Sequence, residues 1–78
     1  MAQLDINNIE KIEKTRNTIH ERVYTTYTTF ESGGNKYLQL DTYGRISRDN
    51  PEKLSQSIQV NKETARYLIS LLKSEFDL

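Results

Sequence analysis

The sequence predicts an α+β domain with an N-terminal helix, three or four antiparallel strands, and a C-terminal helix packed on one face of the sheet. Three observations predict this class. The stretch from Arg22 to Tyr43 alternates around two glycines as a β-hairpin does, and residues 55–60 alternate again. Apolar residues then recur at helical spacing from Ala65 to Phe76.

The length of 78 residues predicts a single domain over 1–78, with the N-terminal helix of 1–14 at its periphery. A domain of this size buries only about 60 to 65 % of the surface that its unfolded chain exposes. Hydrophobic residues make up 35 % of the chain and cysteine is absent, so neither disulfides nor thiolate metal sites can reinforce a thin core. We therefore expect self-association, most simply as a homodimer.

The charge balance gives no global attraction to nucleic acid or to a membrane surface. Eleven basic and eleven acidic residues give a net charge of zero, and the pI is near 6.6. An anionic partner would have to meet a local basic patch. The sequence shows neither a basic start followed by an apolar run nor an apolar stretch of membrane-spanning length, so we expect a cytoplasmic protein without membrane contact.

The N-terminal helix is predicted from Leu4 to about Lys14, because Ile6, Ile9 and Ile12 recur at helical spacing. Its start could be capped by Asp5, Asn7 or Asn8. The threonine-rich stretch that follows favours an extended chain, and the first strand could begin as early as Thr18.

The hairpin turns at Gly33-Gly34, since glycine tolerates the positive φ of tight two-residue turns. Folding the chain there sets a register in which five pairs are expected to share one face: Glu31 with Lys36, Phe30 with Tyr37, Thr28 with Gln39, Thr26 with Asp41, and Tyr24 with Tyr43. The other face receives Thr29 with Leu38, Tyr27 with Leu40, and Thr25 with Thr42.

A polar loop follows from Gly44 and carries three cations, Arg45, Arg48 and Lys53, around the turn signal Asn50-Pro51. A third strand is predicted from Ser55 to Val60. Asn61 stands where a helix cap is wanted, and the helix after it has an apolar stripe of Ala65, Leu68, Ile69, Leu72 and Phe76, widened by Tyr67 and Leu71.

The last helix can cover only one side of the sheet, and we expect it to cover the aliphatic side, with Val23, Tyr27, Leu38, Leu40, Ile58 and Val60. The opposite side is expected to present Arg22, Tyr24, Thr26, Thr28, Phe30, Tyr37, Gln39, Asp41, Tyr43, Ser55, Ser57 and Gln59. Three uses of that side stay open: a plain solvent-facing surface, half of a dimer interface, or a platform that stacks the bases of unpaired nucleic acid.

Motifs for catalysis are weak. His20 and Glu21 are adjacent in an extended chain and so point to opposite faces. Asp41 has no evident carboxylate partner, and Gly33-Gly34 precedes no helix that could form a phosphate cradle. We therefore expect no enzymatic activity, no catalytic residue, no metal site and no cofactor.

The C-terminal half, from Lys36 to about Phe76, resembles the positive cofactor four family. The resemblance lies in the strand with Lys36-Tyr37, the basic loop, the strand Ser57-Ile58-Gln59-Val60, and Asn61-Lys62-Glu63 opening an amphipathic helix. The family consists of small dimeric proteins with a curved antiparallel sheet and one helix that bind single-stranded DNA.

The resemblance implies a dimer that binds single-stranded nucleic acid. Stacking would come from Tyr24, Tyr37 and Tyr43, and positive charge from Arg22, Lys36, Arg45, Arg48 and Lys53. The alternative is a protein-interaction module, a regulatory or inhibitory partner of a larger cytoplasmic complex, that uses the same face or the Ile6-Ile9-Ile12 helix.

Overall fold

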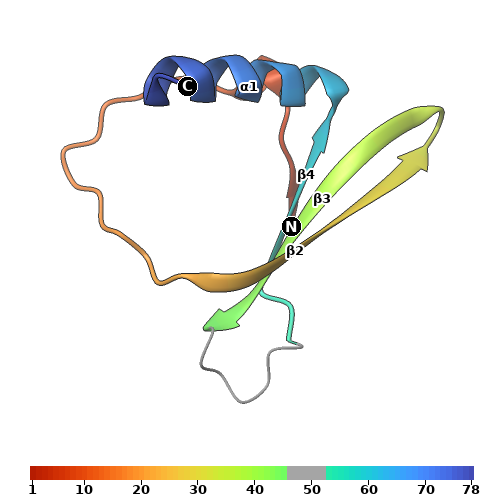
Figure 1. Cartoon of the computed structure of the whole chain (residues 1–78), viewed down its shortest axis with the longest axis horizontal. Coiled ribbons are helices and arrows are strands. Elements are labelled where there is room, and N and C mark those ends of the chain that lie inside the picture. The colour runs from red at the N-terminus through yellow and green to blue at the C-terminus, as the bar shows by residue number, and fades with distance from the viewer. Residues whose placement is uncertain (46–52) are drawn as a thin grey trace.

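The computed structural model describes residues 1–45 and 53–78. Within them the chain forms β1 (Ala2–Gln3), the 3-10 turn η1 (Ile6–Asn8), β2 (Val23–Ser32), β3 (Asn35–Arg45), β4 (Gln56–Asn61) and α1 (Lys62–Phe76). The strands described make one four-stranded sheet in the order β1-β4-β3-β2 (Figure 1). The expected α+β class is confirmed, but the sheet is mixed, because β1 runs parallel to β4 while the other neighbours are antiparallel.

The β2–β3 hairpin has the predicted turn, and the predicted register holds as far as Thr25 and Thr42, whereas the predicted pair of Tyr24 with Tyr43 falls at an irregularity and is not part of the ladder. Gly33 and Gly34 both have positive φ, +59° and +80°, as a two-residue turn between twisted strands requires. Pairing continues without a shift from Ser32 and Asn35 back to Thr25 and Thr42, and then a bulge lets Val23 pair with Arg45. The hairpin therefore begins at Val23, and the earlier start at Thr18 is wrong.

The pair Glu31 and Lys36 does not share a face with Phe30 and Tyr37, contrary to the sequence prediction. Both pairs have the predicted partners, but they are consecutive along the ladder, and side chains of consecutive strand residues point to opposite faces. Lys36 accordingly lies on the side that carries Leu38.

The predicted N-terminal helix is absent; the only helical structure there is η1. The side chain of Asp5 accepts hydrogen bonds from the backbone N of Asn7 at 3.0 Å and from Nδ2 of Asn8 at 2.7 Å, which closes a single turn. Ile9 is already extended, with φ −112° and ψ 123°. A helix from Leu4 to Lys14 would be too short to be stable without a packing partner. Ile12 is 59 % exposed, so burial of the isoleucines does not stabilise such a helix.

Helix α1 forms as predicted and both ends are capped. The side chain of Asn61 accepts from the backbone N of Thr64 at 2.9 Å, and Asp77 ends the helix in the left-handed conformation with its N–H bonded to the carbonyl of Lys73. The strand before it spans Gln56–Asn61 rather than Ser55–Val60, although Ser55 N still donates to the carbonyl of Thr42 at 2.8 Å.

The helix does not cover the sheet as expected. It contacts β4 and η1, and Figure 1 shows it lying beyond the end of β4 rather than across β2 and β3. Tyr27, Leu40 and Ile58 on the aliphatic side are exposed, and no hydrophobic side chain among the described residues is fully buried. The radius of gyration is 14.8 Å, against about 11.5 Å for a compact domain of this length. The single chain is therefore open.

Candidate nucleic-acid interface

One side of the sheet carries the aromatic and hydroxylic residues, and we call it the aromatic face. Between the turn and Thr26 it follows from the register, because directly paired residues share a face and alternate positions repeat it. Tyr24 and Tyr43 lie at the bulge and are placed on this face by their contacts with each other and with Thr26. Its members on β2, β3 and β4 are Tyr24, Thr26, Thr28, Phe30, Tyr37, Gln39, Asp41, Tyr43, Ser57 and Gln59.

Two pairs of aromatic rings mark the two ends of this face. Near the start of β2, Tyr24 and Tyr43 have ring centroids 5.4 Å apart at an interplanar angle of 43°. Near the hairpin turn, Phe30 and Tyr37 are also 5.4 Å apart and nearly parallel, at 20°. The hydroxyls of Tyr43 and Thr26 lie 3.2 Å apart, which fixes the Tyr43 ring. Tyr24 and Phe30 are 54 % and 38 % exposed, so both ends have a ring that a ligand can reach.

A chain of side-chain hydrogen bonds lies on the same face, across β3 and β4. Gln59 donates to Gln39 at 2.8 Å. Gln39 in turn donates to Oδ1 of Asp41 at 2.9 Å, and the nearly buried hydroxyl of Ser57 donates to the same oxygen at 2.6 Å. We call these four residues the polar ladder. The alternation of the sequence predicts these four residues on this face but not their contacts, which follow because the register that pairs Leu40 with Ile58 also pairs Gln39 with Gln59 and Asp41 with Ser57.

Of the five predicted cations, Lys36 is the one that the structure places away from the aromatic face. Arg22 precedes β2 and Lys53 precedes β4, and both are exposed. Lys36 points to the opposite side of the sheet. Arg45 is the last residue of β3 and its side chain lies outside the described part, as does the whole of Arg48. Tyr24, Tyr37 and Tyr43 are thus brought to one face, whereas Lys36 is on the other.

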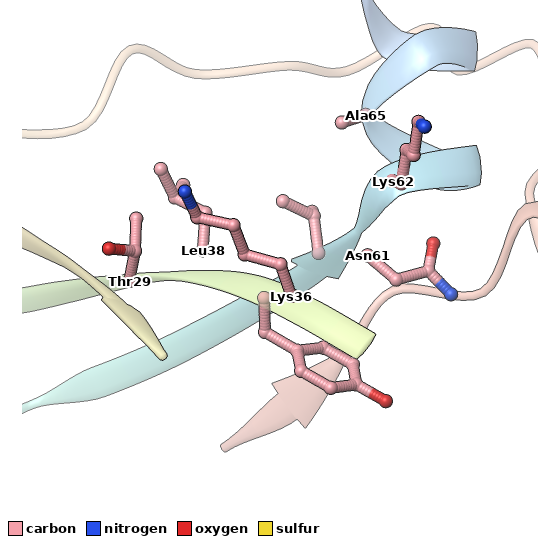
Figure 2. A pocket seen from close by; sticks show the side chains of 8 residues that line it. Thr29, Lys36, Leu38, Asn61, Lys62 and Ala65 are labelled. Atoms are coloured by element: carbon pink, nitrogen blue, oxygen red, sulfur yellow. The ribbon is translucent and has the colours of Figure 1, made fainter. Parts of the chain in front are cut away.

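The side of the sheet opposite the aromatic face carries Thr25, Tyr27 and Thr29 of β2, Leu38, Leu40 and Thr42 of β3, and Ile58 and Val60 of β4; we call it the apolar face. Where it meets α1 there is a groove, and Figure 2 shows Thr29, Lys36 and Leu38 on one wall and Lys62 and Ala65 on the other. Lys36 and Lys62 thus line the same groove as the aliphatic residues Leu38 and Val60.

Residues 1–45 and 53–78 contain no cluster of three or more His, Cys, Asp or Glu that could hold a metal ion. His20 is exposed in the segment that runs as a wide arc between η1 and β2 (Figure 1). No helix in the described part of the chain is long and apolar enough to cross a membrane.

Comparison with known proteins adds no assignment to this geometry. No protein-family model matches the chain, and neither a curated protein nor a solved structure matches it.

Proposed function

We propose that the aromatic face binds single-stranded nucleic acid, without enzymatic activity and without a cofactor. The observation that carries the proposal is the placement of two accessible ring pairs at opposite ends of one sheet face. Base–aromatic stacking contributes about 1–3 kcal/mol per base and tolerates any sequence, because every base has a π-face. The resemblance of the C-terminal half to the positive cofactor four family points to the same ligand.

The spacing of the ring pairs fits a short strand of nucleic acid. Tyr37 and Tyr43 are six residues apart on β3, which corresponds to about 20 Å at 3.3 Å per residue. About six stacked nucleotides span that length at 3.4 Å each. The polar ladder lies between the ring pairs, and its amide and carboxylate groups can meet the hydrogen-bonding edges of bases that unpaired strands leave open.

Phosphate contacts in this proposal come from the margins of the face. Arg22 and Lys53 are exposed and available. Arg45 at the end of β3 and Arg48, which follows it in the sequence, add charge. Lys36 is not among the cations that we propose to contact phosphate, because it lies on the apolar face. Asp41 is an anion on the face itself, so stacking has to supply a larger share of the affinity than charge. The compartment that we propose is the cytoplasm, where such strands are found.

A titration tests the proposal. A fluorescently labelled oligonucleotide should show increased anisotropy with micromolar protein at low salt, since phosphate contacts strengthen as salt falls. The double variant Arg45→Ala with Arg48→Ala should flatten the salt dependence. Absence of any anisotropy change at low salt contradicts the proposal.

A protein-interaction module is the second candidate, and strand β2 is the observation that favours it. β2 is an edge of the sheet, and from Val23 to Phe30 it has no charged residue, proline or glycine. Such an edge can accept a strand from a partner by β-augmentation. This function predicts that pull-down from a nuclease-treated lysate recovers a stoichiometric polypeptide, whereas recovery that disappears with nuclease supports nucleic acid.

A further inference from the structure

The single chain leaves two apolar surfaces uncovered, a face of the sheet and a stripe on the helix. Surfaces of these two kinds normally pack against each other. One is the apolar face of the sheet, where Tyr27 is 70 % exposed. The other is a stripe on α1 formed by Ala65, Ile69, Leu72 and Phe76, which we call the outer stripe; Ile69 is 56 % exposed and Phe76 is 68 % exposed. Ala65 lines the groove with Leu38 and Val60, so the two surfaces are continuous.

The helix already uses its other apolar side within the chain. Thr64 is fully buried and its hydroxyl reaches the carbonyl of Leu4 at 3.4 Å. Tyr67, Leu68 and Leu71 are half-buried and follow Thr64 at spacings that keep them on the same side. This inner side holds α1 against the N-terminal segment and β4, whereas Ile69, Leu72 and Phe76 of the outer stripe stay exposed.

The chain exposes more surface than a compact monomer of its mass, and part of that excess is enough for a dimer interface. The chain exposes 7247 Å², whereas a compact monomer of 9.1 kDa exposes about 4,900 Å². The excess is about 2,300 Å² per chain, part of which belongs to the extended arc over 10–22. Obligate homodimers bury about 2,000–5,000 Å² in total, so covering even half of this excess on each of two chains suffices.

A second copy of this chain is the occupant that the surface fits. Each copy offers both a helix stripe and a sheet face, so one two-fold contact can cover both kinds of surface on both chains. The net charge of zero adds no repulsion between copies. We propose that the outer stripe and the apolar face form an isologous homodimer interface, and that the hydrophobic core of the protein lies between two copies.

Paired glutamate substitutions and the mass in solution test the interface. Sedimentation equilibrium should give about twice 9.1 kDa, and the melting temperature should increase with protein concentration. Ile69→Glu and Tyr27→Glu should each raise the dissociation constant by about 30-fold or more, as central interface residues do. Ser70→Glu and Thr28→Glu should leave it unchanged, because these exposed neighbours point away from the proposed interface.

Two results overturn the proposal. One is a mass of 9.1 kDa at micromolar concentration with a melt that does not depend on concentration. The other is a doubled mass that Ile69→Glu and Tyr27→Glu leave intact, which would put the contact elsewhere, for example at the β2 edge. Oligonucleotide binding is measured separately on the aromatic face, so failure of the dimer and failure of the proposed function are distinguishable.

A milder variant covers the case in which the glutamate variants do not fold. The chain contains no cysteine, so Ile69→Cys and Ser70→Cys each introduce a single thiol. The Ile69→Cys thiol should react with iodoacetamide more slowly as protein concentration increases, while the Ser70→Cys thiol should react at a constant rate. Equal rates for both thiols at every concentration contradict the interface.

Discussion

Replacing Tyr24 by alanine tests whether the aromatic face binds by stacking. Tyr24 is the more exposed ring of its pair and lies 5.4 Å from Tyr43, so a base can reach its open side. Its removal deletes one stacking platform, worth about 1–3 kcal/mol. At 1.4 kcal/mol per tenfold, the dissociation constant for a labelled oligonucleotide should increase about 5- to 150-fold.

The salt dependence of binding separates stacking from charge in this test. Tyr24→Ala removes no cation, so the slope of log affinity against log salt should stay that of the wild type while the whole line moves down. Tyr24→Phe is the matched control, because it keeps the ring and loses only the hydroxyl. The assay is fluorescence anisotropy at three salt concentrations, well below the melting temperature, since loss of the ring pair also costs about 0.5–1.5 kcal/mol of stability.

Equal losses for Tyr24→Ala and Tyr24→Phe would refute the reasoning, because the ring would then have no part in binding. An unchanged affinity for Tyr24→Ala would refute it as well. A loss that disappears at low salt would assign the effect to altered charge contacts instead.

The remaining predictions concern the ligand length, the polar ladder, the turn and the cap. Affinity for oligothymidine should increase steeply up to about six nucleotides, the length that joins the ring pairs, and a titration series of lengths checks this. Asp41→Ala should lower the free energy of unfolding in urea by about 1–3 kcal/mol, because it leaves the nearly buried Ser57 hydroxyl without its acceptor, whereas Asp41→Asn keeps an acceptor oxygen and should cost less. Gly34→Ala should cost about 1–2 kcal/mol by thermal melting, since φ is +80° there although the space is open. Asn61→Ala should cost about 1 kcal/mol and reduce helical ellipticity, because Thr64 N–H loses its partner.

The hairpin could be predicted from the sequence because everything that fixes it is local. The adjacent glycines set the turn, and once the turn is fixed every partner from Ser32 and Asn35 to Thr25 and Thr42 follows by counting. The same counting puts Lys36 and Tyr37 on opposite faces of the sheet, because the two residues are consecutive. The charge pair of Lys36 with Glu31 shows that the two residues are direct partners, but not which face they share.

The N-terminal segment could not be predicted in the same way, because two local preferences compete there. The isoleucine spacing favours a helix, whereas the Asp5 side chain bonds to Asn7 and Asn8 and closes a single turn. Leu4 is also held by its N–H bond to the carbonyl of Gln59 at 2.9 Å, a contact between distant parts of the chain that periodicity does not reveal.

The position of α1 could not be predicted from the sequence for a related reason. Its apolar residues form two stripes, one containing Thr64, Leu68 and Leu71 and the other containing Ile69 and Leu72. Periodicity shows that both exist but not which one the chain itself covers. The buried Thr64 decides this, and a threonine is not a residue that a hydrophobic pattern would select as the best-buried side chain of a helix.

The two faces of the sheet allow nucleic-acid binding and dimerisation to occur together. A two-fold contact through the apolar faces turns both aromatic faces outward, on opposite sides of the dimer, because the two faces of each sheet point in opposite directions. A strand of about six nucleotides spans one aromatic face and cannot reach the other. Short oligonucleotides should therefore bind with a stoichiometry of one per chain and without competition between copies. A longer strand gains affinity only when it can pass around the edge of the dimer and reach the second aromatic face. Binding to that second face is then intramolecular.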